Sequence, residues 1–284
     1  MLSPRSFLSY KQEGKKISMI TCYDYTTSRI LAKSKVDIVL VGDSLGMVIY
    51  GYPSTLQVDI TKMVFHTEAV ARGLNGTKFL VSDMPFLSYQ SSRRDAVLNA
   101  GLLVKAGANA VKVEGGKRVV DRIKAILDAD IPVMGHLGLT PQSINVFGGF
   151  KLQSTSEKEI EKIFEDALLL EREGCFAIVL ELIPEEVAKV ISENLKIPTI
   201  GIGAGRFCDG QVLVIHDMLG YFVDFKPKHV KRYSNVSDEI LNSVNSFVSD
   251  VLSGLFPDKD NVFSINEEVD IQAISERVFG KNVF

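Results

Sequence analysis

The sequence predicts an α/β fold, a (β/α)8 barrel of the TIM type with a C-terminal helical extension. Short runs rich in Val, Ile and Leu alternate with longer amphipathic stretches, which is the pattern of a parallel sheet covered by helices. About eight such runs fall within roughly 220 residues, and a closed barrel needs eight strand–helix units. A doubly wound open sheet is the alternative, but it would seldom need so many evenly spaced units.

The predicted strands are the short apolar runs, which cover residues 17–24, 36–43, 78–85, 109–116, 131–138, 176–183, 197–205 and 211–218. Between them, apolar residues recur at spacings of three and four, and Gly or Asp ends several of the stretches, as expected for amphipathic helices. The clearest of these helices cover residues 92–107, 118–130, 157–174 and 185–195. The link between the last two strands is short and has room for only a turn of helix.

We expect one domain over residues 1–284, with the barrel over about 17–235 and a C-terminal helix and tail over 236–284. The stretch 234–256 has a helical pattern, and Ser237 is a plausible N-cap for it. The tail after Pro257 is polar and acidic, and we expect it to be loosely held.

Composition limits the compartment and the partners. The net charge of −3 gives no indication of nucleic acid or an anionic membrane as a partner. The three cysteines, Cys22, Cys175 and Cys208, have no metal or disulfide spacing, which favours a reducing compartment. The N-terminus lacks the apolar core of a signal peptide, and no apolar run approaches the ~20 residues of a membrane span. We therefore expect a soluble cytoplasmic protein.

Five successive predicted strands carry ionisable side chains at or near their C-terminal ends. In a (β/α)8 barrel these ends open onto one rim, where active sites are found. A single polar residue at a strand end commonly caps a loop, whereas burying five together without a function would be costly. The sequence therefore predicts an active site at this rim, built from Asp43 with Ser44, Asp83, Lys112 with Glu114, His136, and Glu181.

Three of these residues, Asp43, Asp83 and Glu114, are carboxylates on neighbouring strands and form the predicted metal site. Oxygen donors without Cys, and with one His nearby, favour a hard divalent cation, Mg²⁺ before Mn²⁺ or Zn²⁺. A cation would also relieve the repulsion among like charges. Because Mg²⁺ keeps several waters and binds through one or two carboxylates plus the substrate, one of the three can act through water.

The other residues suggest substrate and proton chemistry. Lys112 and Glu114 are two apart on a strand and share a face, so they form either an ion pair without a ligand or two members of a site in which Lys112 neutralises a substrate carboxylate. Glu181 lies between two leucines, where a raised pKa would suit a general base; holding a loop amide is its alternative role. His136 lies in "GHLGLTPQS", whose small and turn-forming residues let the backbone approach a ligand.

Two further stretches carry weaker signals. "GIGAG" (201–205) follows the seventh predicted strand, where many barrels bind phosphate, but tight packing also requires glycine. The basic stretch 225–233 is expected to be a solvated face. We interpret His66, His216 and His229 as structural or surface residues.

Nine stretches, in order between about residues 15 and 235, resemble the ketopantoate hydroxymethyltransferase (3-methyl-2-oxobutanoate hydroxymethyltransferase) family. They are "TCYDYTTS", "VGDSLGMV", "GYPSTLQV", "HTEAVARG", "VSDMPF", "AGANAVKVEGG", "GHLGLTPQSINVFGGF", "VLELIP" and "GIGAG" with "DGQVLVIHDMLG". The family transfers a one-carbon unit from 5,10-methylenetetrahydrofolate, its co-substrate, to 3-methyl-2-oxobutanoate. The product is 2-dehydropantoate, and the reaction is the first committed step of pantothenate synthesis.

The resemblance implies roles for the rim residues. Asp43 and Asp83 match the Mg²⁺ ligands of the family, and Glu114 is the third acidic residue at the metal. Asp43, Ser44, Asp83 and Lys112 fall where the family holds the keto acid, and Glu181 matches the proton acceptor. The family fold is a TIM barrel in a large homo-oligomer, typically a decamer. The role of residues 257–284 is left open.

The chemistry of the residues agrees with this reaction. The hydrogen to be removed lies on a hindered tertiary carbon beside a ketone and is barely acidic in water. Mg²⁺ chelated by the 2-oxo acid would polarise the ketone and hold the enolate charge. Glu181 would take the proton, and the enolate would attack the one-carbon unit. No motif indicates a folate site.

Two alternatives are open. A metal-dependent 2-oxo acid C–C lyase or mutase of the phosphoenolpyruvate mutase/isocitrate lyase type shares the barrel, the metal and the substrate class. Many of these lyases carry a catalytic Cys in a mobile lid, often within "KKCGH", and this chain has no Cys between Cys22 and Cys175. A non-catalytic keto-acid or metal sensor would be expected to lack a base or a metal ligand, and none is missing here.

Overall fold

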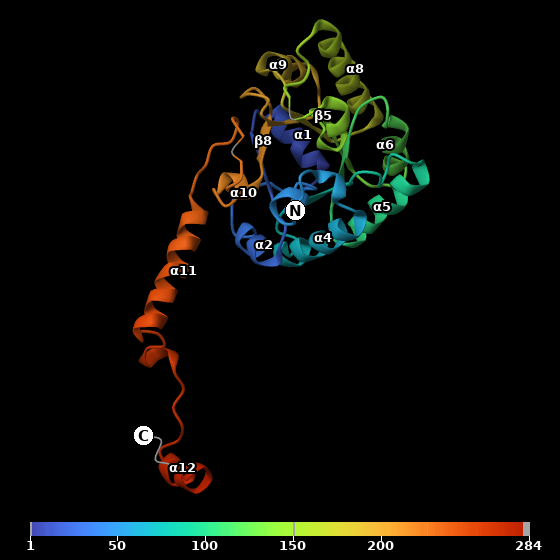
Figure 1. Cartoon of the computed structure of the whole chain (residues 1–284). Coiled ribbons are helices and arrows are strands. Elements are labelled where there is room, and N and C mark those ends of the chain that lie inside the picture. The colour runs from blue at the N-terminus through green and yellow to red at the C-terminus, as the bar shows by residue number, and fades with distance from the viewer. Residues whose placement is uncertain (1, 150, 226, 281–284) are drawn as a thin grey trace. The chain divides into compact units, whose positions relative to one another are not determined.

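The computed structural model describes residues 2–149, 151–225 and 227–280, and its first unit is a closed parallel barrel (Figure 1). Within the described residues, each strand pairs with the next and β8 pairs with β1, which confirms the predicted (β/α)8 fold. The strands are β1 (Ile17–Thr21), β2 (Ile38–Val41), β3 (Phe79–Asp83), β4 (Ala110–Glu114), β5 (Val133–Gly138), β6 (Ala177–Glu181), β7 (Thr199–Ile202) and β8 (Gly210–Leu213).

Helices surround the barrel. Those that follow strands are α2 (Tyr25–Leu31), α3 (Leu45–Val48), α4 (Ile60–Leu74), α5 (Arg93–Lys105), α6 (Val120–Leu127), α7 (Ile144–Phe147), α8 (Glu157–Glu173), α9 (Glu185–Asn194) and α10 (Ile215–Met218). Their ends follow local chemistry. Asp59, for example, caps α4 by accepting from the Lys62 amide at 2.8 Å, and Asn75 ends this helix in the left-handed conformation.

One predicted strand is partly wrong. The run 211–218 overlaps β8, which begins one residue earlier at Gly210, but the second half of the run forms the short helix α10. Periodicity alone does not separate a strand from a helical turn in so short an apolar run.

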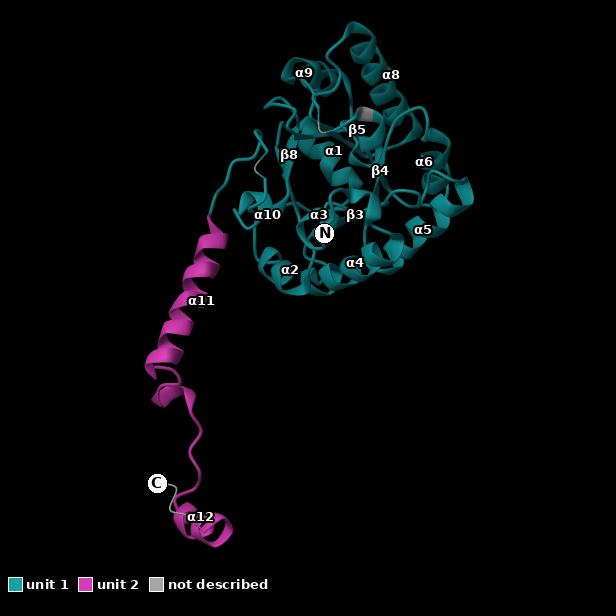
Figure 2. Ribbon diagram, viewed as in Figure 1, with its two compact units in different colours: residues 1–234 teal, residues 235–284 magenta. Residues whose placement is uncertain are grey.

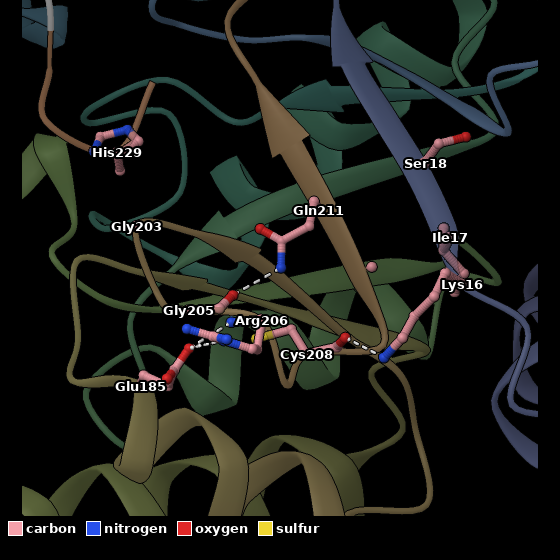
Figure 3. A pocket seen from close by; sticks show the side chains of 11 residues that line it. Lys16, Ile17, Ser18, Glu185, Gly203, Gly205, Arg206, Cys208, Gln211 and His229 are labelled. Carbon is pink, nitrogen blue, oxygen red and sulfur yellow. Dashed lines mark hydrogen bonds and ion pairs between the residues drawn. The ribbon is translucent and has the colours of Figure 1, made fainter. Parts of the chain in front are cut away.

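The link from β7 to β8 is short, as predicted, and its described residues do not form even the single turn of helix for which it has room. A hollow of about 710 Å³ lies beside this link and the outer side of β8 (Figure 3). Several of its charged and polar side chains have partners within the hollow. Arg206 Nε contacts Glu185 Oε2 at 3.1 Å, Gln211 Nε2 donates to the Gly205 carbonyl at 2.9 Å, and Lys16 Nζ donates to the Cys208 carbonyl at 2.8 Å.

The N-terminal end of the barrel is closed by α1 (Pro4–Gln12). Phe7 of α1 is fully buried and packs edge-to-face on Phe79, with the ring centroids 5.1 Å apart. Lys11 Nζ, in the same helix, lies 2.8 Å from Asp209 Oδ2 and anchors α1 to the start of β8. Because apolar side chains fill this end, the polar side chains of the strands gather at the opposite end.

The chain divides into two compact units, residues 1–234 and 235–284 (Figure 2). The second contains α11 (Val236–Ser253), the 3₁₀ helix η3 (Lys259–Asn261) and α12 (Ile271–Phe279). The assignment of Ser237 as the N-cap of α11 is wrong. The backbone is already helical at Val236, so Asn235 takes the cap position, and Ser237 donates from within the first turn to Asn235 Oδ1 at 3.2 Å. The assignment of 1–284 to a single domain stays a prediction.

Among the residues that the structure describes, no helix combines the length and the apolar character needed to cross a bilayer.

Candidate active site

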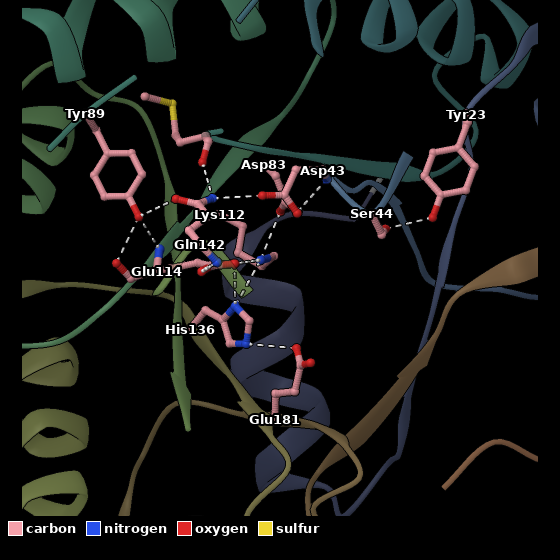
Figure 4. Close-up of polar contacts among 11 residues, drawn as sticks. Tyr23, Asp43, Ser44, Asp83, Tyr89, Lys112, Glu114, His136, Gln142 and Glu181 are labelled. Atoms are coloured by element: carbon pink, nitrogen blue, oxygen red, sulfur yellow. Dashed lines mark hydrogen bonds and ion pairs between the residues drawn. The ribbon is translucent and has the colours of Figure 1, made fainter. Parts of the chain in front are cut away.

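All of the predicted rim residues line one cavity of about 400 Å³ at the C-terminal end of the barrel. Strands β2 to β6 deliver them in order. Figure 4 shows the charged side chains pointing toward one another, whereas Ser44 faces Tyr23. The register between neighbouring strands explains why these side chains lie close together. In the paired strands, Asp83 lies beside Lys112, Glu114 beside His136, and Gly138 beside Glu181.

Lys112 is buried at the centre of this cluster (Figure 4). Its Nζ lies 3.1 Å from Asp83 Oδ1, 3.1 Å from His136 Nδ1 and 3.9 Å from Glu114 Oε1. The closest carboxylate is therefore that of Asp83, and the pair with Glu114 is the longer contact. Burial by itself lowers the pKa of Lys112, but the nearby charges of Asp83, Glu114 and Asp43 outweigh it and raise the pKa, so the ammonium is retained.

Asp43 and Asp83 are buried next to each other, and the Asp43 amide donates to Asp83 Oδ2 at 3.0 Å. Burial raises the pKa of both carboxyl groups. The charges of Asp83 and Glu114 raise the pKa of Asp43 further, while Lys112 acts against the shift at both. Asp83 Oδ1 is buried, and its charged neighbour is the Lys112 ammonium, 3.1 Å away. Three carboxylates thus surround one ammonium, and the cluster has an excess of negative charge.

The surroundings of Asp43 and Asp83 fit a hard cation, because they offer buried oxygen donors and surplus negative charge. In the described part of the chain, however, no group of three His, Cys, Asp or Glu side chains is arranged as a metal site. The arrangement therefore suits Mg²⁺ held by two carboxylates, with water and a ligand completing its coordination.

Glu114 has both carboxylate oxygens engaged. Oε2 accepts from the Gln142 amide at 3.0 Å, and Oε1 lies 3.4 Å from His136 Nδ1. Burial raises the pKa of Glu114, but the contacts with His136, Lys112 and Gln142 outweigh burial and lower it. Glu114 therefore stays ionised. With its oxygens engaged, it is better placed to contact a cation through water than directly.

Glu181 ends β6, and its side chain is 17% exposed, whereas that of His136 is 2% exposed. Oε2 of Glu181 lies 3.2 Å from His136 Nε2 (Figure 4). The adjacent Leu180 does not supply the apolar surroundings expected for Glu181, because successive side chains on a strand point to opposite faces. Among the described residues, no backbone amide donates to the Glu181 carboxylate, so the alternative role of holding a loop is not supported.

His136 links the two halves of the cluster, since its ring nitrogens face Lys112 and Glu114 on one side and Glu181 on the other. Burial and the charge of Lys112 lower its pKa, but the contacts with Glu114 and Glu181 outweigh them and raise it. The turn after β5 depends on glycine. Gly138 has φ +91°, and a Cβ there would lie 2.2 Å from the Glu181 carbonyl oxygen.

Three functional candidates were missed by the sequence interpretation. Tyr23 donates to or accepts from Ser44 Oγ at 2.8 Å. Gln142 contacts both Asp43 and Glu114, and Tyr89 contacts Gln142 and the Glu114 backbone (Figure 4). Gln142 lies within "GHLGLTPQS", so its presence in that loop was a usable signal. Tyr89 lies in a loop without a distinguishing pattern.

Beyond the charged cluster, the cavity is largely apolar. Its wall there includes Met47, Val48, Leu182, Phe222 and Phe225, with Asp217 and His229 among the polar groups. His229, which we interpreted as a structural or surface residue, lines both this cavity and the hollow beside β8. In "GIGAG", packing accounts for Gly205, because a Cβ there would lie 2.5 Å from Glu185 Cβ.

Comparisons with known proteins agree on one family. A family model described as ketopantoate hydroxymethyltransferase matches residues 2–259. A Clostridium botulinum (strain 657 / Type Ba4) protein named 3-methyl-2-oxobutanoate hydroxymethyltransferase is 52% identical over 265 residues, which cover 93% of this chain and 96% of that protein. A protein of the same name from Clostridium acetobutylicum is 53% identical over 265 residues, with the same coverage of 93% and 96%.

Solved structures show a similar fold at low identity. Phosphonopyruvate hydrolase in complex with oxalate and Mg²⁺ has a TM-score of 0.61 at 10% identity, over 99% of this chain and 100% of that one. The 2,3-dimethylmalate lyase of the phosphoenolpyruvate mutase/isocitrate lyase superfamily has a TM-score of 0.55 at 14% identity, over 99% and 95% of the two chains. These similarities concern the fold alone.

Proposed function

Since the chain belongs to the ketopantoate hydroxymethyltransferase family, we propose that it is a one-carbon transferase acting on 3-methyl-2-oxobutanoate. It takes the hydroxymethyl unit from 5,10-methylenetetrahydrofolate and forms 2-dehydropantoate for pantothenate and coenzyme A synthesis. The observation that carries this proposal is the meeting of Lys112, the Asp43–Asp83 pair and Glu181 in one cavity. A 2-oxo acid needs these three functions: a cation for its carboxylate, a site for charge at its ketone oxygen, and a base.

In this proposal the substrate is held by the charged half of the cavity. Lys112 faces the substrate carboxylate, and Ser44 offers a hydroxyl already oriented by Tyr23. Asp43 and Asp83 would hold Mg²⁺, with Glu114 contacting it through water. The cation supplies positive charge where the ketone oxygen becomes negative. His136 contacts both Lys112 and Glu181, and thereby orders the wall against which the substrate lies.

Glu181 is the proposed proton acceptor. It is the most exposed carboxylate of the cluster and has only His136 as a close polar neighbour among the described residues, so an oxygen is available to the substrate. The C3–H bond breaks, its proton passes to Glu181, and its electron pair forms the enolate. The enolate carbon then forms a bond to the one-carbon unit, whose bonds to the folate nitrogens break; water supplies the oxygen of the new hydroxymethyl group, and tetrahydrofolate leaves. The apolar wall beyond the charged cluster leaves space for the folate donor, because a small branched oxo acid fills only part of about 400 Å³.

Proton exchange at C3 of 3-methyl-2-oxobutanoate tests this proposal. The protein is incubated with the keto acid in D₂O, with and without Mg²⁺ and without folate, and the C3 proton signal is followed by NMR. Loss of the signal that depends on Mg²⁺ supports the enzyme. Saturable binding of the keto acid without exchange would instead identify a sensor.

A lyase or mutase is the alternative enzyme, and it would cleave or rearrange a 2-oxo acid without a one-carbon donor. The described residues that line the cavity include no cysteine, and Cys22, Cys175 and Cys208 are all buried and unpaired. The absence of a thiol at the cavity argues against the lyases with a lid cysteine. Unpaired cysteines also support the cytoplasmic location that is part of the proposal.

Lys112→Met is expected to raise the KM for the keto acid about tenfold or more, because a charge-assisted contact of roughly 1.5–3 kcal/mol is lost. Steady-state kinetics at saturating Mg²⁺ measure this change. Lys16→Met is the matched control, since Lys16 is also hydrogen-bonded but lies outside the cavity. An unchanged KM with lowered thermal stability would mean that Lys112 is only the counter-ion of Asp83.

We also propose that the chain forms a homo-oligomer, with a decamer as the expected size. Helix α11 supports this, because its own compact unit buries none of its residues, and its apolar side chains include Ile240, Val244, Phe247 and Val251. These recur every three or four residues and form one face, which needs a partner surface. Light scattering should give the mass of a large oligomer for the wild type and a smaller mass for Val244→Glu/Val251→Glu. Asn242→Glu/Ser249→Glu, on the opposite side of the helix, is the control, and a monomeric wild type would contradict the proposal.

A further inference from the structure

Gln142 connects four of the loops and strands that build the charged cluster (Figure 4). Its side-chain Nε2 donates to Asp43 Oδ2 at 2.9 Å and to the Met84 carbonyl at 2.8 Å. Its Oε1 accepts from Tyr89 Oη at 3.0 Å and from Gln90 Nε2 at 3.0 Å. Its backbone N–H donates to Glu114 Oε2 at 3.0 Å. One residue thus contacts two of the three clustered carboxylates.

We infer that Gln142, braced by Tyr89, is a positioning residue that holds the Asp43 and Glu114 carboxylates in the arrangement needed for Mg²⁺ and substrate. The inference rests on the proposed function, because it concerns the same cavity and the same cation. It adds two residues that do not themselves meet the reacting atoms.

An amide side chain matches the hydrogen-bonding groups that surround Gln142, because it has a donor end and an acceptor end. One end of the Gln142 side chain faces two acceptors, Asp43 Oδ2 and the Met84 carbonyl, and the other end faces donors from Tyr89 and Gln90. A flipped amide would set acceptor against acceptor, so the hydrogen-bond network fixes its orientation. A carboxylate at this position would add a fourth negative charge beside Asp43 and would have no proton to donate.

The local fold holds Gln142 firmly. It lies in the 3₁₀ helix η2 (Pro141–Ser143), which directly follows β5, and the Ser143 amide closes the turn onto the Thr140 carbonyl at 2.8 Å. Gln142 is only 6% exposed, so its polar groups have little access to water. Pro141 at the start of the turn restricts the backbone further. The turn therefore directs the backbone amide to Glu114 and the side chain to Asp43 at the same time.

Tyr89 braces this arrangement from the other side. Its hydroxyl accepts from the Glu114 amide at 3.2 Å and lies 3.0 Å from both the Glu114 carbonyl and Gln142 Oε1. It has a single proton to share between these two acceptors, whereas Gln90 supports Gln142 Oε1 independently. Loss of the Tyr89 hydroxyl should therefore disturb the cluster less than loss of the Gln142 amide.

The carboxylates need a positioning residue because they carry like charges. Asp43, Asp83 and Glu114 are like charges in one buried cluster: Asp83 and Glu114 oppose the ionisation of Asp43, and Glu114 opposes that of Asp83. Without Gln142, Asp43 would keep its backbone contact to Asp83 but lose the donor that holds its side chain. The carboxylate would then take other rotamers in the absence of a cation, and Mg²⁺ binding would have to restore the order. Partners that orient metal ligands commonly contribute about 10–100-fold in metal affinity or activity.

The test compares Gln142→Met, Gln142→Glu, Tyr89→Phe and the matched control Ser88→Ala in the full-length protein. Ser88 lies in the same loop as Tyr89, is buried, and its hydroxyl has no hydrogen bond among the described residues. Mg²⁺ affinity without substrate is measured by competition with Mn²⁺ followed by EPR. C3 proton exchange gives kcat and KM for the keto acid at saturating Mg²⁺, and thermal unfolding reports stability.

We expect Gln142→Met to weaken Mg²⁺ binding by roughly 10–100-fold and to lower kcat within the same range, with a smaller change in KM. Gln142→Glu should be no better than Gln142→Met, Tyr89→Phe should change in the same direction by less, and Ser88→Ala should match the wild type. Lower thermal stability of Gln142→Met with unchanged Mg²⁺ affinity and kcat would overturn the inference. If Gln142→Met does not fold, a wild-type Mg²⁺ affinity and kcat in Tyr89→Phe would overturn it.

The two proposals fail in different ways. A wild type that binds Mg²⁺ without exchanging the C3 proton would contradict the proposed function, and the Mg²⁺ affinities would still decide the role of Gln142. Normal exchange in the wild type, together with a Gln142→Met variant that behaves identically, would contradict the positioning role alone.

Discussion

Glu181→Gln is expected to bind Mg²⁺ and the keto acid as the wild type does, and to lose C3 proton exchange by roughly 10²–10⁴-fold, the range typical of losing a general base. The amide keeps the shape and polarity of the side chain but cannot accept the proton. Binding should survive because Asp43, Asp83 and Lys112 lie on other strands and have no contact with Glu181 among the described residues. Overall turnover should fall in parallel, since enolate formation precedes attack on the one-carbon unit.

The matched control for this variant is Glu185→Gln. Glu185 begins α9, shortly after Glu181 in the chain, and its carboxylate contacts Arg206 at 3.1 Å outside the cavity. Exchange by Glu185→Gln should equal that of the wild type. If Glu181→Gln keeps exchange but loses turnover, Glu181 serves the folate half of the reaction. If it loses keto-acid binding as well, Glu181 positions the substrate, and His136 is the next candidate for the base.

The sequence was sufficient for the barrel because its strands are buried on both faces. Such strands appear as continuous apolar runs, and a charge inside one of them is conspicuous. Lys112 and Glu114 within β4 were noticeable for this reason. Each predicted run overlaps an observed strand, and the last one also extends into the helix α10. The rim residues could be listed because parallel strands all end on the same side.

The residue that pairs with Lys112 was harder to predict than the face of β4 on which Lys112 lies. Residues two apart on one strand are separated by about 6.6 Å, whereas neighbouring strands lie about 4.8 Å apart. A residue on the next strand is therefore the closer one, and the register places Asp83 beside Lys112. Register between strands depends on the loops that connect them and is not written in either strand alone.

Gln142 and Tyr89 illustrate a second limit. Both lie in loops, where no periodicity marks the buried positions, and both are neutral, so neither looks like a charge out of place. Their importance comes from the course of two loops that meet over the end of β4. The partner surface of α11 is also outside what one sequence indicates, because an amphipathic pattern shows that a face must be covered but does not show by what.

Asp43→Asn is expected to abolish Mg²⁺-dependent exchange, by roughly a thousandfold or more, because charge stabilisation by a bound cation is worth several kcal/mol and about 1.4 kcal/mol changes a rate tenfold. An asparagine keeps the shape of the side chain and removes one of three neighbouring negative charges. For this reason we prefer it to alanine. Asp43 and Asp83 are buried, and Asp83→Ala in particular would leave the buried Lys112 without its nearest carboxylate.

The structure also predicts what the metal does to stability. Binding to the folded protein alone stabilises it by about 2.7 kcal/mol at a ligand concentration a hundred times the Kd. Mg²⁺ should therefore raise the Tm of the wild type but not that of Asp43→Asn, which without Mg²⁺ should be at least as stable as the wild type because a repulsion is removed. Asp37→Asn is the control at the opposite end of β2, where Asp37 accepts from Ser18 at 2.7 Å.

Full exchange by the wild type in EDTA, or by Asp43→Asn at any Mg²⁺ concentration, would exclude Asp43 as a ligand of an essential cation. A Tm of Asp43→Asn that rises with Mg²⁺ as in the wild type would place the cation elsewhere in the cavity.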